Sequence, residues 1–180
     1  MENLKRNGFL ILEAIFLSAL FLFALVLDGA SAVSLSWQFY LAMGFLALLL
    51  TLPSFLSSQR KQTLWLFLSF SFGLFTLHFL AVSPVKPFMR FHRDIGNGMA
   101  TQEVQHLFSQ HFPKDGRFRQ PRLSLGVGIP FDARYGTDVT DTPTQSFHYI
   151  LDPADGRFNS ETLTVYFKNG RVVGNEYLSD

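Results

Sequence analysis

Cysteine is absent from this chain of 180 residues. Its absence excludes disulfide bonds, thiolate catalysis, zinc sites with cysteine ligands and an N-terminal cysteine that carries lipid. Charge is also scarce before residue 86, where the charged residues are Glu2, Lys5, Arg6, Glu13, Asp28, Arg60 and Lys61. In the rest of the chain Lys and Arg balance Asp and Glu. No concentrated basic face therefore indicates nucleic-acid binding.

Three long apolar runs fill the charge-poor part, at residues 8–27, 35–56 and 63–82. The last run, TLWLFLSFSFGLFTLHFLAV, would form a helix about 30 Å long, which matches the hydrocarbon core of a bilayer. Short connections predict three antiparallel transmembrane helices within residues 1–83. Ala30-Ser31-Ala32 is similar to a signal cleavage site, but the first run exceeds the usual core of about 7 to 15 residues, which favours an uncleaved helix.

The positive residues of the short loops predict the orientation of these helices. Lys5 and Arg6 precede the first run, and Arg60 and Lys61 lie between the second and third runs. The loop after the first run has neither Lys nor Arg. Because positive loops stay cytoplasmic, we expect the N-terminus and residues 57–62 in the cytoplasm. The part after the third run is then extracytoplasmic, in a multi-pass protein of the inner or plasma membrane that also contacts membrane lipids.

Two ionisable residues interrupt the apolar runs, and buried charge in a membrane is a functional hypothesis by default. Glu13 lies about 8 Å inside one end of the first helix, and His78 lies about 6 Å inside the opposite end of the third. Because roughly 16 Å separates their depths in a core of about 30 Å, we do not expect them to pair. Each can extend to its nearer interface or bond to a neighbouring helix.

Residues 84–94 are predicted to form an extended juxtamembrane linker, because Pro84 and Pro87 oppose a continued helix. The cations of this linker lie beside Phe88 and Phe91, which suits contact with lipid headgroups. The candidates for that contact are Lys86, Arg90 and Arg93.

A short helix is predicted at residues 102–112, with Thr101 as its N-cap and Pro113 as its stop. Its apolar residues recur at helical spacing and form one stripe that suits packing on a sheet: Val104, Leu107, Phe108 and Phe112. The loop at 114–122, KDGRFRQPR, is basic and rich in turn formers. It suits an anionic partner, lipid headgroups or simply solvent.

Alternating apolar residues predict a three-stranded antiparallel meander in the C-terminal third. The residues expected on one face of its first two strands are Phe147, Tyr149, Leu151, Leu163, Val165 and Phe167. Asn169-Gly170 then predicts a tight hairpin into residues 171–178, since both residues accept positive φ. Residues 123–129 are a further possible strand.

These elements predict a small α+β domain at 95–180, with a helix packed on an antiparallel sheet, after three transmembrane helices. Packing of the helix on one face leaves the other face or an edge strand for a partner. The predicted partner-binding residues lie on the opposite face of the second strand: Thr162, Thr164 and Tyr166.

No catalytic or metal-binding spacing links the four histidines that follow the third apolar run: His92, His106, His111 and His148. His106 and His111 lie about 140 degrees apart on a helix, which prevents joint chelation. The acidic residues Asp132, Asp138 and Asp141 lack the spacing of a calcium loop. We therefore expect no metal or cofactor, and an enzyme or metal protein using these histidines stays an alternative.

Two short motifs resemble the SmpA/OmlA (BamE-like) family. One is Ile95-Gly96-Asn97-Gly98-Met99 followed by the helix start Thr101-Gln102-Glu103-Val104, and the other is the closing hairpin LTVYFKNGRVV at 163–173. The resemblance covers about half of the chain and implies an αββ-type fold with a binding role outside the cytoplasm. Characterised members are non-enzymatic accessory subunits in the assembly of outer-membrane proteins. This chain differs in having three apolar runs in place of a signal peptide and a lipid-bearing cysteine.

Three classes of function remain after these exclusions. A membrane-anchored, non-enzymatic module that binds a protein near the membrane surface fits a small sheet domain without a cofactor signature. An enzyme would need an organised constellation of nucleophile, base or metal ligands. A small transport or channel accessory subunit would need more polar residues among the helices than Glu13 and His78.

Overall fold

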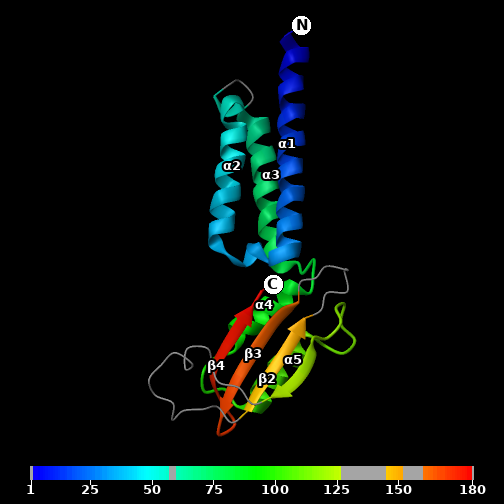
Figure 1. The fold of residues 1–180 in the computed structure, drawn as a ribbon. Helices are drawn as coiled ribbons and strands as arrows, with labels where there is room; N and C mark the ends of the chain where they lie inside the picture. Colours follow the sequence, from blue (N-terminus) through cyan, green and yellow to red (C-terminus); the bar gives the residue numbers. More distant parts are fainter. Residues whose placement is uncertain (1, 57–59, 127–144, 152–159, 180) are drawn as a thin grey trace. The chain divides into compact units, whose positions relative to one another are not determined.

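The computed structural model describes residues 2–56, 60–126, 145–151 and 160–179, and the chain forms two compact units, Met1–Val82 and Ser83–Asp180. The first unit is helical (Figure 1). Its elements are α1 (Glu2–Ser31), the short 3-10 helix η1 (Val33–Leu35), α2 (Trp37–Phe55) and α3 (Arg60–Phe79).

The three predicted spans are confirmed as helices that are long and apolar enough to cross a membrane, at Gly8–Ser31, Trp37–Phe55 and Arg60–Phe79. Their middle parts share a buried apolar cluster that includes Leu17, Met43 and Leu74. The first helix is longer than predicted and includes Asp28, which the sequence placed in a loop.

Small residues line a groove of about 450 Å³ between α1 and α3: Ala14, Ser18, Ser69 and Gly73. A Cβ atom at Gly73 would lie 3.0 Å from the ring of Phe21, so the missing side chain at Gly73 leaves room for that ring. The small residues at i and i+4 in both helices thus leave a groove beside this contact.

The second unit begins with α4 (Val85–Asp94), so the prediction of an extended linker at 84–94 is wrong. Pro84 is the N-cap and Pro87 lies in the first turn, where backbone N–H groups have no intrahelical acceptor. The N–H of Phe88 donates to the carbonyl oxygen of Pro84 over 3.2 Å and closes the first turn. Phe88 and Phe91 are both fully buried, which makes α4 part of the folded unit.

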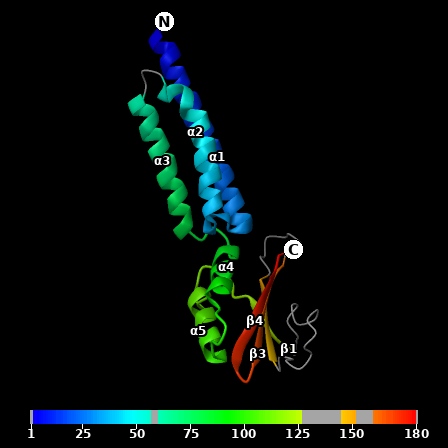
Figure 2. The same cartoon turned by 90° about the vertical axis from the view of Figure 1, so that its left-hand side faces the viewer.

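A second helix and a four-stranded antiparallel sheet complete this unit: α5 (Thr101–His111), β1 (Arg122–Gly126), β2 (Gln145–Leu151), β3 (Glu161–Lys168) and β4 (Arg171–Leu178). The strands lie in sequence order, with β1 and β4 at the edges. Both α4 and α5 lie on one face of the sheet (Figure 2). The predicted meander is therefore confirmed as β2, β3 and β4, and β1 extends it to four strands.

Aromatic rings fill the space between the sheet and the two helices. The ring of Tyr149 in β2 lies 5.0 Å from that of Phe91 in α4 and 4.9 Å from that of Phe108 in α5, centroid to centroid. The predicted inward residues of β2 and β3 are all buried. The alternation pattern thus identified the core face of the sheet correctly.

Candidate functional site

The three residues predicted to bind a partner lie on the sheet face that turns away from the helices. Thr162 is half-buried, but Thr164 and Tyr166 are only 7% and 3% exposed. The expectation of an exposed binding surface is therefore wrong for Thr164 and Tyr166. Alternation along a strand reveals which residues share a face, whereas it does not reveal how accessible that face is.

Hydrogen bonds connect polar side chains across this face. His148 of β2 lies directly opposite Thr164 of β3, and its Nδ1 is 3.0 Å from the Thr164 Oγ1. Its Nε2 is 3.0 Å from the Oγ of Ser146. A Cβ atom at Gly126 in β1 would lie 2.9 Å from that Nε2, so only glycine leaves room for the ring. Both nitrogens of His148 thus have hydroxyl partners.

In enzymes, a hydroxyl nucleophile can be bonded to an imidazole base that a third group orients. Ser146, His148 and Thr164 are bonded in the same order. Ser146, however, has no exposed surface. A nucleophile must reach its substrate, so the described geometry assigns these bonds to the satisfaction of polar groups within the sheet. Beside them, the hydroxyl of Tyr166 donates to Glu176 Oε2 over 2.7 Å and extends the polar network to β4.

The other histidines of this unit lie apart, each with its own surroundings. The Nε2 of His111 is 2.8 Å from the Oδ2 of Asp94, which connects α5 to α4. His106 is exposed and contacts Gln110 within α5. Among the described residues no group of three His, Asp or Glu side chains could hold a metal ion. The sequence-predicted acidic residues at 130–144 lie outside the described part of the chain.

His92 stacks on Tyr177 of β4, with ring centroids 5.3 Å apart and planes 23° from parallel. Burial lowers the pKa of the His92 imidazole, Asn175 opposes this shift through a hydrogen bond, and the positive charge of Arg93 adds to it. His92 is therefore a neutral packing residue near neutral pH rather than a charged surface group.

The three cations predicted to contact lipid headgroups differ in accessibility. Lys86 is 1% exposed, Arg90 is half-buried and Arg93 is exposed. The three cations recur at i, i+4 and i+7, so they lie along one side of α4, which changes from buried at Lys86 to exposed at Arg93. The burial of Lys86 does not fit the predicted headgroup contact.

Exposed apolar side chains occur at the edge strand β1. Leu123 and Leu125 pair with Tyr149 and Phe147 of β2, so all four lie on the same face of the sheet. Tyr149 and Phe147 are buried, but Leu123 and Leu125 are 44% and 65% exposed. In the described part of the chain no strand pairs with the outer edge of β1. This edge therefore offers both backbone groups and apolar side chains.

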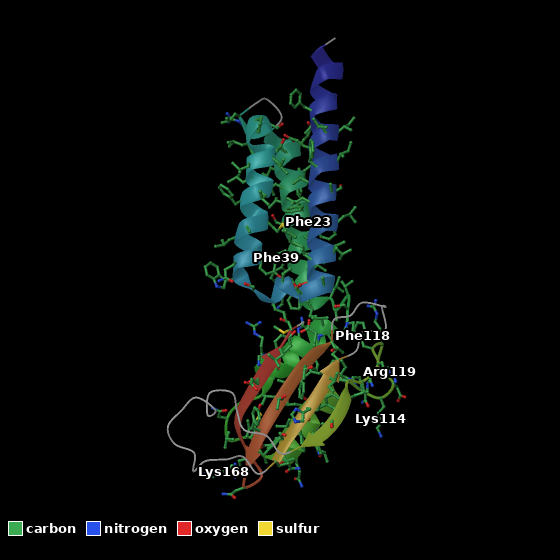
Figure 3. The ribbon with its side chains drawn as sticks, viewed as in Figure 1. Phe23, Phe39, Lys114, Phe118, Arg119 and Lys168 are labelled. Carbon is green, nitrogen blue, oxygen red and sulfur yellow. The ribbon has the colours of Figure 1, made fainter. Side chains whose placement is uncertain are left out.

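The basic loop between α5 and β1 lies beside this edge (Figure 3). A turn orders its start, where the N–H of Gly116 donates to the carbonyl oxygen of Pro113 over 2.9 Å. Its end is held by Gln120, whose side chain donates to the carbonyl oxygen of Phe112 over 2.6 Å. The cations of the loop are exposed, as is the first residue of β1: Lys114, Arg117, Arg119 and Arg122.

In the helical unit, His78 bonds to a backbone carbonyl rather than to an acidic partner. Its Nδ1 lies 3.0 Å from the carbonyl oxygen of Ser34, which also accepts a bond of 2.8 Å from the hydroxyl of Tyr40. A carbonyl only accepts, so the Nδ1 of His78 carries the proton. The N–H of Ser34 donates to Asp28 Oδ1 over 2.9 Å. The sequence did not indicate this cluster, because Asp28 and Ser34 fall between the first two apolar runs.

Glu13 is 6% exposed, so it packs against the other helices instead of extending to an interface. Glu13 lies on the same side of α1 as Leu17, Ala24 and Asp28, which are also buried, and this helical spacing would have indicated its burial.

Comparison of the chain with models of known protein families, with curated proteins and with solved structures gave no match.

Proposed function

We propose that this chain is a membrane-anchored, non-enzymatic binding module. Its three apolar helices hold it in the inner or plasma membrane, with the N-terminus and residues 57–62 in the cytoplasm. The unit at 83–180 then lies outside the cytoplasm and binds a protein near the membrane surface. The charge distribution of the short loops supports this orientation.

The observation that carries the proposal is the apolar edge strand β1. An exposed strand edge is a template for an extended segment, whose backbone adds to the sheet while alternate side chains enter apolar contacts. Leu123 and Leu125 continue the buried face of the sheet to this edge and provide those contacts. Monomeric proteins usually blunt such edges with charge or cover them.

The charge beside this edge indicates the chemistry of the partner. Lys114, Arg119 and Arg122 are exposed in the loop and at the start of β1. Complementary charge accelerates encounter and selects partners. The partner segment is therefore an extended stretch with alternate apolar residues and nearby Asp or Glu. An accessory role in protein assembly, which the resemblance to the SmpA/OmlA family implies, is compatible with this mode of binding.

Two leucines of the sheet allow a matched test in the full chain, solubilised from native membranes. Leu125 in β1 and Leu178 in β4 are 65% and 63% exposed, and they lie on opposite edges. Leu125→Glu should abolish recovery of the partner, because it places a charge in the apolar contact and repels acidic residues. Leu178→Glu should leave recovery intact. Equal recovery with both variants would contradict the proposal.

A further inference from the structure

Each of the three long helices of the first unit has one stripe of buried residues along its length, and the three stripes are nearly equally long. The buried residues are Glu13, Leu17, Ala24 and Asp28 in α1, Phe39, Met43, Ala47, Thr51 and Ser54 in α2, and Thr63, Phe70, Leu74 and Leu77 in α3. Each stripe is about 22 Å long at 1.5 Å per residue. The middle of each stripe is apolar, and at least one end of each stripe is polar.

Hydrogen bonds around Ser34 place one end of all three buried stripes at the same height along the helix axes. Ser34 bonds to Asp28 at the end of α1, to Tyr40 at the start of α2, and to Leu77 and His78 at the end of α3. Because the stripes start from this level and have nearly equal lengths, their other ends also share a level. Those ends are polar as well: Glu13, Thr51, Ser54 and Thr63. We call these four residues the Glu13 layer.

The contact between Phe21 and Gly73 gives an independent register for α1 and α3. Both helices run in the same direction, because α2 connects them as an antiparallel neighbour (Figure 1). Glu13 precedes Phe21 by eight residues, and Thr63 precedes Gly73 by ten. The two polar residues therefore differ in height by only about 3 Å.

The Glu13 layer contains buried oxygen atoms without a partner. Glu13 is 6% exposed and Thr63 is fully buried, yet neither the Oε2 of Glu13 nor the Oγ1 of Thr63 has a hydrogen-bond partner in the described part of the chain. Thr51 donates its hydroxyl proton to the carbonyl oxygen of Ala47 over 2.8 Å, which leaves its oxygen able to accept. A buried carboxylate without compensation costs several kcal/mol. At the opposite level, the bonds around Ser34 satisfy the polar groups.

We propose that the Glu13 layer binds a monovalent metal cation of the size of sodium. Carboxylate and hydroxyl oxygens are hard ligands that suit such cations. One carboxylate balances one positive charge, and the nearest cations of α3, Arg60 and Lys61, are exposed. Glu13 binds the cation through its carboxylate, and the hydroxyls of Thr63 and Thr51 complete the ligand set from the other two helices. The cation thereby joins all three helices about 8 Å inside the span.

The test compares thermal unfolding of the purified full chain in detergent micelles in sodium chloride and in choline chloride at equal ionic strength. Sodium should raise the unfolding temperature of the wild-type chain, since it binds the folded state. Glu13→Gln should lose this sodium-dependent shift. Thr63→Val should need about tenfold more sodium for half of the shift, because a ligand to the charge is removed.

Thr76→Val is the matched control in the same helix, since the hydroxyl of Thr76 bonds within α3 to the carbonyl oxygen of Phe72. It should respond to sodium as the wild-type chain does. If Glu13→Gln does not fold, the comparison of Thr63→Val with Thr76→Val decides. Identical unfolding of the wild-type chain in both salts would overturn the proposal. A stability that responds to pH and not to sodium would assign a proton, not a metal cation, to Glu13, and would overturn it as well.

Discussion

The backbone N–H and the side-chain hydroxyl of Thr101 both donate to the carbonyl oxygen of Gly170, over 3.1 and 3.2 Å. The start of α5 is thereby attached to the β3–β4 hairpin, 69 residues later in the chain. Ala100 adds an antiparallel bridge to Arg171 at the same place. The start of α5 and the β3–β4 hairpin are therefore in direct contact, and the hairpin turn supports the helix start.

Replacement of Gly170 should destabilise the second unit through this contact. Gly170 and Asn169 have φ values of 72° and 52°, which glycine adopts without strain and other residues rarely adopt. Gly170→Ala should cost about 1 to 2 kcal/mol of the free energy of unfolding. Thr101→Val, which keeps the N–H bond, should cost about 1 kcal/mol or less. Hydrogen exchange of the second unit in the full chain would measure both, and an unchanged exchange rate in Gly170→Ala would contradict this account.

The two faces of β3 should respond differently to truncation, but both should respond. Phe167→Ala removes a fully buried ring and should cost about 3 to 5 kcal/mol. Thr164→Ala leaves the Nδ1 of His148 without its partner and should cost about 1 to 3 kcal/mol. Denaturant titration gives both values. A neutral Thr164→Ala would show that the bond to His148 does not stabilise the sheet.

Stability of the second unit should fall as the medium becomes acidic, because of His92. Burial holds its pKa in the folded state below the unfolded value of about 6.5, so the unfolded state binds the proton more readily. The full stability is present above that value and decreases as pH falls below it. His92→Gln should flatten the pH dependence between about pH 7.5 and 5.5, whereas His106→Gln, at an exposed position, should not. A wild-type stability that rises on acidification in this range would show the wrong sign.

Fusions of a reporter enzyme test the proposed orientation. A reporter after Asp180 should behave as extracytoplasmic, and one inserted in residues 57–62 should behave as cytoplasmic, because Arg60 and Lys61 hold that segment inside. In intact cells exposed to protease, a C-terminal tag should be cleaved once the outer layers of the cell are permeable. The reverse pattern would place the second unit in the cytoplasm and contradict the proposed function.

Periodicity predicted most of the regular structure correctly. Phe147 and Tyr149, like Leu163 and Val165, alternate as core residues of a sheet do, and they are buried. The hairpin at Asn169 follows from its preference for positive φ. The helical spacing of Glu13 and Leu17 also indicated that both are buried, but the charge of Glu13 suggested that its side chain extends to a membrane interface.

The errors have identifiable physical causes. Pro84 and Pro87 suggested an extended linker, although proline is tolerated at a helix start: Pro84 is the N-cap of α4 and Pro87 lies in its first turn. Thr164 and Tyr166 were assigned to an open surface because alternation separates two faces without indicating what each face contacts. An edge strand was one expected place for a partner, but the exposed apolar edge at Leu125 was not identified, since the position of a strand at a sheet edge depends on long-range pairing.

Site-specific photo-crosslinking in native membranes tests the central claim most directly. A photoreactive residue in place of Leu125 should form a covalent adduct with a partner protein, and the same residue in place of Leu178 should not. Mass spectrometry of the adduct should map the contact to a segment with alternate apolar residues and nearby Asp or Glu. Charge reversal of Lys114 and Arg119 should reduce its yield, whereas Lys168→Glu, at the hairpin end of the sheet (Figure 3), should not. Adducts of equal yield from both leucines, or none from Leu125, would contradict binding at the β1 edge.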